Sequence, residues 1–318
     1  MIFHITLPFL LNNQPADISD LVCATCKRGH YIKADRDSIK LIRQYVTTHG
    51  STNQKELFRA HTDLFDITES LGTYLTTLKL DETISYRDAE FLVNETARVV
   101  IENANKEWPV YQHVIDIYKS DQQFGDVFTL LKKAKDKKWI EGAHAGGTGE
   151  IKDTVNRDPY PTKQDNIRLK KTLALFDRDT DDNVHYDGNK NSLFKYFSGK
   201  DYTQVREEDI YTLTQKEPFW HMWYKRAIEN YFPNEQYVKA GFDISAIIGL
   251  KSEERDYKLL GGNKTHPALI KGYGKDSLKQ LVNGLSREKL EKNLKKFDID
   301  GIKISEMQLF LLKLVRIL

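Results

Sequence analysis

The stretch LALFDRDTDD, which runs from Leu173 to Asp182, decides the fold that the sequence predicts. Its first four residues form a continuous apolar run, which is typical of a buried strand in a parallel sheet. Such a strand delivers the residues after it to the carboxyl edge of the sheet, where open α/β folds bind ligands. Because crowded acids repel one another, we expect a divalent cation to neutralise them. The carboxylates that follow the strand are Asp177, Asp179, Asp181 and Asp182.

The composition indicates an ordinary folded protein of 318 residues, with 40% hydrophobic and 30% charged residues. Its net charge of +2 excludes a globally basic nucleic-acid binder, so such binding would need local basic patches. Two cysteines are too few for a disulfide framework and fit a reducing cytoplasm. The opening MIFHITLPFLL lacks a basic leader and predicts a strand, and no apolar run is long enough to span a bilayer. We therefore expect a cytoplasmic protein.

Three regions follow one another along the chain. Residues 1–95 predict a mainly helical region with a first short strand, and residues 236–318 predict a helical, lysine-rich region. Residues 96–235 alternate apolar strands with helices, an order that favours a parallel sheet. The predicted fold class is α/β, with a mainly parallel sheet flanked by helices and with helical N- and C-terminal additions.

Several local patterns make narrower predictions. Ser85, with Asp88 three residues later, predicts a capped helix start, and Pro109 fits the first turn of another helix. Residues 207–215 predict a strand, and the aromatic residues 219–232 predict a helix. The apolar residues 306–318 are a candidate docking or dimerisation surface.

A second apolar strand, VVIE, ends in Glu102. Because parallel strands end at the same edge of a sheet, we expect Glu102 to meet Asp177 and Asp179 although they lie far apart in the sequence. Mg²⁺ binds through one or two carboxylates and leaves positions for phosphate and water. Two such ions roughly 3.5–4 Å apart stabilise the attacking and leaving oxygens of a phosphodiester displacement.

This pattern resembles the Toprim (topoisomerase–primase) fold. Residues 99–115 resemble its first motif, with Asn103 where glycine is usual, and residues 144–151 resemble its glycine-rich segment. The segment KRAIENYF, residues 225–232, resembles a motif of Toprim nucleases in bacterial phage defence, relatives of the overcoming-lysogenization-defect nucleases. The similarity covers roughly residues 97–235.

The resemblance implies a Mg²⁺- or Mn²⁺-dependent endonuclease that cuts DNA or RNA, with two metal ions. Glu102, Asp177 and Asp179 match the catalytic metal ligands, and Asp181 is a further ligand or a supporting acid. No tyrosine matches the covalent role found in topoisomerases, so hydrolysis by metal-activated water is the simpler chemistry. The less certain positions are the acids Glu107 and Glu229 and the alternative transition-state or phosphate lysines Lys152 and Lys225.

The resemblance also implies a toxic effector in anti-phage defence, restrained by an operon-encoded partner such as an ATPase sensor or another regulatory component. A homo-oligomer is a further expectation. Two other functions stay open. One is a non-catalytic Toprim scaffold with a binding or regulatory role, and the other is a housekeeping Toprim RNA-maturation enzyme or primase.

The basic run RLKK leads directly into the acidic strand and is the candidate for holding a nucleic-acid backbone, through Arg168, Lys170 and Lys171. The lysine-rich residues 132–138 predict a solvated face. The aromatic side chains between Phe219 and Tyr231 favour core packing over stacking on bases.

Three other motifs are weighed and given less weight. Cys23, Cys26 and His30 form a partial zinc pattern without a fourth ligand, so free thiols are favoured over a zinc site. The residues after Asp177 lack the glycine and the glutamate of a calcium loop. The glycine-rich residues 144–151 lack the lysine of a nucleotide-binding loop and predict a tight turn beside the metal site.

Overall fold

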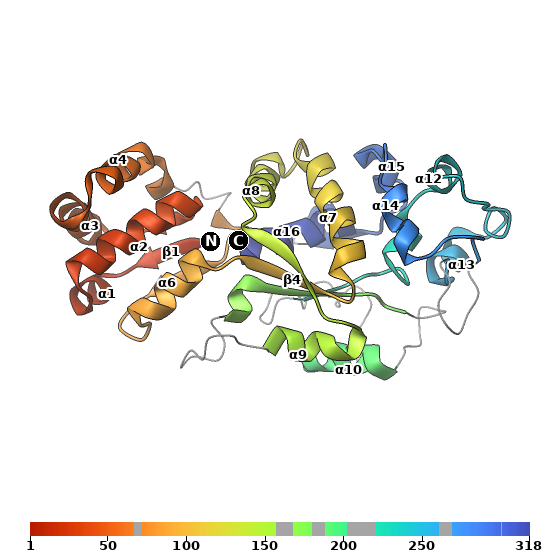
Figure 1. Cartoon of the computed structure of the whole chain (residues 1–318), viewed down its shortest axis with the longest axis horizontal. Coiled ribbons are helices and arrows are strands. Elements are labelled where there is room, and N and C mark those ends of the chain that lie inside the picture. The colour runs from red at the N-terminus through yellow and green to blue at the C-terminus, as the bar shows by residue number, and fades with distance from the viewer. Residues whose placement is uncertain (67–71, 157–167, 180–187, 202–219, 261–268, 300) are drawn as a thin grey trace.

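The computed structural model describes residues 1–66, 72–156, 168–179, 188–201, 220–260, 269–299 and 301–318. It confirms the α/β class, because two parallel sheets carry helices on their faces (Figure 1). In the described residues, no helix has the length and apolar character needed to cross a membrane.

The N-terminal region contains a parallel sheet of order β2-β1-β3, built from β1 (Ile2–Ile5), β2 (Tyr31–Lys33) and β3 (Thr77–Leu80). The prediction of one short strand in this region is confirmed by β1, but it missed the strands β2 and β3. β2 and β3 have three and four residues, which is too short for a clear periodic signal. The helical elements here are α1 (Leu7–Asn12), α2 (Pro15–Arg28), α3 (Arg36–His49), α4 (Thr52–Ala60), the 3₁₀ turn η1 (Thr62–Phe65) and α6 (Tyr86–Asn94).

The helix start at Ser85 is confirmed. The Asp88 amide donates to the Ser85 hydroxyl oxygen at 3.1 Å, and that hydroxyl donates to the Asp88 carboxylate at 2.6 Å. α6 therefore begins with its free amide groups partly satisfied, and it leads directly into the second sheet.

The second sheet is parallel throughout and has the order β5-β4-β6-β7. Both strands predicted to end in acids are confirmed, and they are the central neighbours β4 and β6. All five residues of β6 are buried, as a continuous apolar strand requires. The strands are β4 (Ala97–Ile101), β5 (Ile140–His144), β6 (Thr172–Phe176) and β7 (Trp220–Met222).

Helices cover both faces of this sheet, with α7, α8 and α16 on one face and α9 and α10 on the other (Figure 1). α7 packs closely against β5 because Gly142 has no side chain, and a Cβ there would lie 2.7 Å from the Trp108 ring. The helices are α7 (Ala104–Tyr118), α8 (Gly125–Asp136), α9 (Ile151–Asn156), α10 (Gly188–Ser198) and α16 (Glu306–Ile317).

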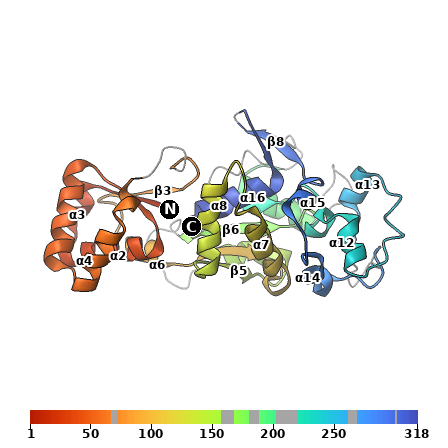
Figure 2. The same cartoon turned by 90° about the horizontal axis from the view of Figure 1, so that it is seen from above.

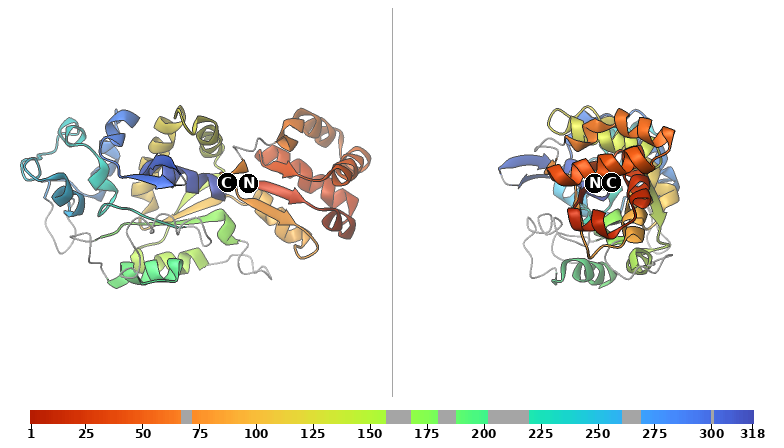
Figure 3. Two further views of the ribbon diagram at one scale, coloured as in Figure 1. Left: turned by 180° about the vertical axis from the view of Figure 1, so that it is seen from behind. Right: turned by 90° about the vertical axis from the view of Figure 1, so that its left-hand side faces the viewer.

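The prediction that the C-terminal region is helical was wrong in part. The region also contains an antiparallel hairpin that projects from the body (Figures 2 and 3). Aspartate and glycine lie at its turn, where the Gly301 amide donates to the Asp298 carboxylate. The elements are β8 (Lys296–Ile299), β9 (Ile302–Ser305), α12 (Asn234–Lys239), α13 (Ser252–Tyr257), α14 (Leu278–Leu281) and α15 (Arg287–Glu291). Short 3₁₀ turns are η2 (Thr148–Glu150), η3 (Arg168–Lys171), η6 (Ile228–Tyr231) and η7 (Lys275–Ser277).

Two helix predictions were wrong in detail. Residues 220–222 form the buried strand β7 and residues 228–231 form the 3₁₀ turn η6, so the described part of 219–232 is not one helix. A short apolar run fits either a strand or a helix, and here pairing with β6 decides. Pro109 lies inside α7 and not in its first turn, since the helix begins at Ala104. The strand predicted at 207–215 lies outside the described residues.

The buried apolar side chains form two clusters. One joins residues between Met1 and Val93, and the other joins residues from Ala97 to Ile317 together with Ile2 and Leu75. α16 belongs to the second cluster, and its buried side chains pack under β4 and β6. The prediction that residues 306–318 offer a docking surface was therefore wrong, because this helix is core.

Candidate active site

The carboxyl ends of β4 and β6 lie side by side. Val100 of β4 pairs with Ala174 of β6, so Glu102 lies two residues beyond one partner and Asp177 three residues beyond the other. Neighbouring strands are about 4.8 Å apart. The sheet therefore brings the two predicted acids to one edge although 75 positions separate them in the sequence.

The glycine-rich turn after β5 lies against Glu102, as predicted. The Thr148 hydroxyl donates a hydrogen bond to the Glu102 carboxylate, and the Gly146 amide donates to the Glu102 main-chain oxygen at 3.2 Å. Gly146 has φ +96°, a left-handed conformation that glycine adopts without a steric cost. This turn fixes the position of Glu102 from the β5 side.

Arg178 anchors the two aspartates on either side of it. Its guanidinium is buried, donates to the Tyr224 main-chain oxygen at 2.8 Å and packs against the rings of Tyr224 and Tyr257. Asp179 has φ +50° and donates its amide to the Arg226 oxygen at 2.9 Å. A non-glycine residue in this conformation is uncommon and often marks a functional position. Asp181 and Asp182 lie outside the described residues.

The charges of Glu107, Asp177 and Glu229 all affect the pKa of one tyrosine, Tyr111. Burial raises the pKa of Tyr111, and the negative charges of these three carboxylates raise it further. All three acids are buried, and they come from the first turn of α7, the end of β6 and the turn η6. The predicted acids from three distant segments therefore act on the same side chain.

The charges of two of these acids also affect a second tyrosine, Tyr273, in the C-terminal region. Burial raises its pKa, and the charges of Glu229 and Asp177 contribute to this shift. Within the described ranges its buried hydroxyl makes no hydrogen bond. A buried hydroxyl without a hydrogen bond is suited to a bound polar group such as a hydrated cation or a phosphate.

The two candidate lysines have different surroundings. Lys225 is buried, and its ammonium lies 2.6 Å from the Asp256 carboxylate. Burial lowers its pKa, and Asp256 partly opposes this shift. Lys152 is exposed on α9, with its ammonium 4.7 Å from the centre of the Tyr196 ring. The described contacts place neither lysine against Glu102 or Asp177.

The predicted nucleic-acid-binding residues lie at the opposite edge of the sheet. Arg168, Lys170 and Lys171 belong to η3, which precedes the first residue of β6. β6 has five residues, so roughly 16 Å of strand separates Lys171 from Asp177. Lys171 is only 2% exposed and donates to the Leu318 oxygen at 2.8 Å. This burial does not favour a contact between Lys171 and a nucleic-acid backbone.

Three of the aromatic side chains after β6 are core residues, as predicted, while Tyr224 is half-buried and Phe219 lies outside the described residues. Trp220, Trp223 and Tyr231 are almost fully buried. Trp223 stacks on Tyr111, with ring centres 6.0 Å apart, and its indole donates to the Tyr111 hydroxyl at 3.4 Å. These rings position Tyr111 among the acids and are not free to stack on bases.

The cysteine and histidine motif is explained by packing. Cys23 and Cys26 lie in α2 as buried free thiols, and burial raises their pKa to about 11 and about 12. Neutral thiols of this kind are poor metal ligands. His30 is buried against Phe3, with one ring nitrogen 3.3 Å from the Val93 oxygen.

The donor set at the acidic edge fits a hard divalent cation. All its donors are carboxylate oxygens, and Mg²⁺ uses one or two of these together with water and substrate phosphates. In the part of the chain that the structure describes, no three histidine, cysteine, aspartate or glutamate side chains form a metal-binding group by themselves. Binding through two carboxylates, such as Glu102 and Asp177, is the arrangement that agrees with both observations.

Sequence reasoning missed four residues of this site. Thr148 lies in the glycine-rich turn that was identified, but a lone threonine gives no signal of its contact with Glu102. Arg178 lies between the two aspartates, and the sequence does not show that it is buried. Tyr111 and Tyr273 have no motif, and only the three-dimensional structure brings them to Asp177.

Comparison of the chain with known protein families, with functionally characterised proteins and with solved structures finds no match in any of the three. The residues of this chain and their placement are therefore the basis for a functional proposal.

Proposed function

We propose that this protein is a metal-dependent nuclease on a Toprim-like scaffold, which hydrolyses phosphodiester bonds of DNA or RNA with Mg²⁺ or Mn²⁺. One observation carries the proposal. The neighbouring parallel strands β4 and β6 end in Glu102 and Asp177, at the same edge of the sheet.

In this proposal Glu102 and Asp177 hold the cation, with Asp179 as a further ligand. A bound divalent cation polarises a phosphoryl oxygen and lowers the pKa of its water. Thr148 and the turn at Gly146 orient Glu102. Arg178 holds in place the neighbouring residues Asp177 and Asp179. The amino end of α7 lies at the same edge and favours negatively charged groups, which suits a phosphate.

Two further parts of the proposal rest on the resemblance to Toprim nucleases and not on the geometry of the site. They are a role as an effector in phage defence and restraint by a regulatory partner such as an ATPase sensor. Co-purification from cells that express the neighbouring genes tests the second part, with a stoichiometric complex as the expected result.

The test of the activity uses purified full-length protein with single-stranded DNA, duplex DNA and RNA in Mg²⁺ or Mn²⁺. We expect cutting of at least one substrate, and loss of cutting when a chelator removes the metal. Asp177→Asn and Glu102→Gln should each reduce the rate by at least about 100-fold, because each removes a charged ligand. Asp37→Asn, in the exposed first turn of α3, should cut like the wild type. Equal cutting by all variants would exclude this site.

A second candidate function is a non-catalytic binding or regulatory subunit on the same scaffold. The observation that favours it is the lack of a three-ligand metal group among the described side chains. Calorimetric titration with Mn²⁺ separates the two functions. If the protein is a nuclease, substitution of Glu102 or Asp177 should weaken Mn²⁺ binding. If it is a non-catalytic scaffold, these substitutions should leave Mn²⁺ binding unchanged.

A further inference from the structure

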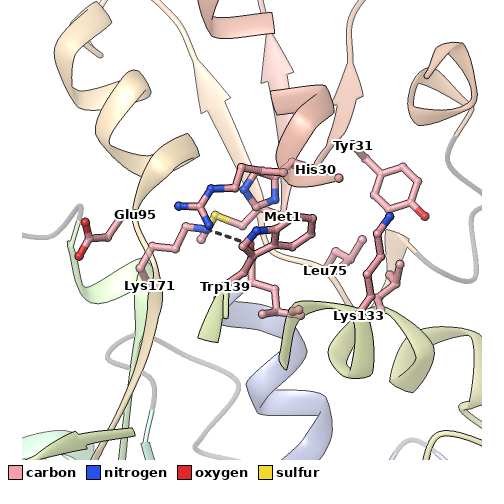
Figure 4. A pocket seen from close by; sticks show the side chains of 13 residues that line it. Met1, His30, Tyr31, Leu75, Glu95, Lys133, Trp139 and Lys171 are labelled. Atoms are coloured by element: carbon pink, nitrogen blue, oxygen red, sulfur yellow. Dashed lines mark hydrogen bonds between the residues drawn. The ribbon is translucent and has the colours of Figure 1, made fainter. Parts of the chain in front are cut away.

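A small cavity lies at the amino edge of the second sheet, between the N-terminal region and the body that carries the acids (Figure 4). Its volume is about 40 Å³. It is lined by α2, β2, α8, the residue Leu75 before β3, the turn η3 before β6, and the residues Met1 and Leu318, so segments far apart in the sequence close it together. The titratable groups that face it are the amino group of Met1 and the side chains of Arg28, His30, Tyr31, Glu95, Lys133 and Lys171.

Positive charge dominates this cavity. Lys171 and Arg28 approach from different elements, and Lys133 lies on the exposed side of α8. Among the described residues of the lining, Glu95 is the acidic side chain. The indole of Trp139 lies between two of the cations, with the Arg28 guanidinium 5.9 Å and the Lys133 ammonium 6.0 Å from its ring centre.

Lys171 is buried, whereas Arg28 is half-buried and Lys133 is exposed. Burial lowers the pKa of Lys171 to about 7, and the charge of Arg28 lowers it further while Glu95 opposes the shift. Burial also lowers the pKa of His30, and Lys171 adds to that effect. Both cations have a hydrogen-bond acceptor, since Lys171 donates to the Leu318 oxygen and Arg28 donates to the Asn94 oxygen. An oxyanion in the cavity would stabilise their charged forms further.

We infer that this cavity is a binding site for a small oxyanion of the phosphate type, held by Lys171 and Arg28 with Lys133 at its mouth. The site is separate from the acidic edge, and it does not depend on the proposed nuclease activity. Arg28 offers a planar fork of donors that matches a phosphate, and Lys171 offers a point charge.

The size of the cavity limits the ligand. A single water needs roughly 10–15 Å³ by the same measure, so the cavity accommodates one tetrahedral anion or a few waters. A whole nucleotide does not fit inside it. The phosphate group is therefore either free or carried on a molecule that remains outside the mouth.

The test is calorimetric titration of the full chain with inorganic phosphate, with sulfate and with a nucleoside 5′-monophosphate. We expect at least one of them to bind, and Lys171→Met to raise its dissociation constant at least 10-fold. The matched control is Lys40→Met, an exposed lysine on α3, which should bind like the wild type. Because an anion favours the charged form of Lys171, binding of sulfate at pH 8 should take up protons.

Each outcome of this experiment decides something. Binding of phosphate and sulfate alone identifies a free oxyanion, and tighter binding of the nucleotide identifies a carried phosphate group. No binding of any probe at about 10 mM would overturn the proposal. Wild-type affinity in a Lys171→Met protein that melts cooperatively would overturn it as well. The binding of the probes and the effect of Lys171→Met are both measured without nucleic-acid cutting. A failure of the anion site would leave the nuclease proposal intact, and a failure of the nuclease proposal would leave the anion site intact.

Discussion

The two edges of the second sheet have opposite chemistry. Acids gather at the carboxyl edge, with Glu102 and Asp177 at adjacent strand ends and Glu107 in the first turn of the helix that follows β4. Cations gather at the amino edge, around Lys171 in the cavity next to the N-terminal region. One strand, β6, joins Lys171 directly to Asp177. The sheet thus separates a site suited to cations from a site suited to anions along a single strand.

The helix α16 connects the same two edges on the face of the sheet. At its start Glu306 accepts hydrogen bonds from the Tyr224 amide and the Tyr231 hydroxyl, both at 2.6 Å. At its end the Leu318 oxygen accepts from Lys171. Each edge therefore depends on a buried charged side chain that this helix contacts, and changes at the two ends should have separable effects.

The largest change in stability is expected at the acidic end of α16. Glu306→Ala removes a fully buried carboxylate and leaves the Tyr224 amide and the Tyr231 hydroxyl without acceptors. We expect a loss of about 3–5 kcal/mol in the free energy of unfolding, measured by chemical denaturation. The exposed Glu288→Ala on α15 should change it by no more than about 0.5 kcal/mol. Similar values for the two variants would show that Glu306 does not anchor this edge.

The two ends should also respond to pH in opposite ways. Burial raises the pKa of Glu306 from 4.5 to about 7, so the neutral form is favoured in the fold and stability decreases as the pH rises through this interval. The shift corresponds to about 3 kcal/mol. Burial lowers the pKa of Lys171 from 10.5 to about 7, so stability increases as the pH rises from 7 toward 10.5.

Two variants check this prediction in buffers without phosphate or sulfate. Glu306→Gln should flatten the stability profile between pH 4.5 and about 7. Lys171→Met should flatten it above pH 7 and, because it replaces a buried charge by an apolar chain, raise stability at neutral pH by about 1–4 kcal/mol. An unchanged profile in either variant would contradict the assigned charge state of that edge.

The smallest effect is expected in the turn that holds Glu102. Gly146→Ala places a side chain at φ +96°, where no neighbouring atom obstructs it, so only backbone strain of about 1–2 kcal/mol should appear. Gly149→Ala is the control, because its space is also open and its φ is not positive. A thermal melt should show a lower midpoint for the first variant alone. Equal midpoints would show that the turn is not fixed by Gly146.

The acidic edge could be predicted from the sequence because its signal is local. Apolar strands that end in acids identify β4 and β6, and parallel strands end together. The basic cavity could not be predicted, because Lys171 in RLKK looks like a solvated lysine until β6 and α16 bury it. The helix predicted at 219–232 failed for a related reason, since pairing with β6 decides the state of a short apolar run.

The most direct test of the central claim, that Glu102 and Asp177 form one cation site, is calorimetric titration with Mn²⁺. The wild type and Lys171→Met should bind the ion alike, since Lys171 lies at the other edge. Asp177→Asn and Glu102→Gln should each weaken binding at least about 10-fold, and the double variant should lose little more than either single variant. Binding that is unchanged in both single variants, or additive losses in the double variant, would contradict a shared site.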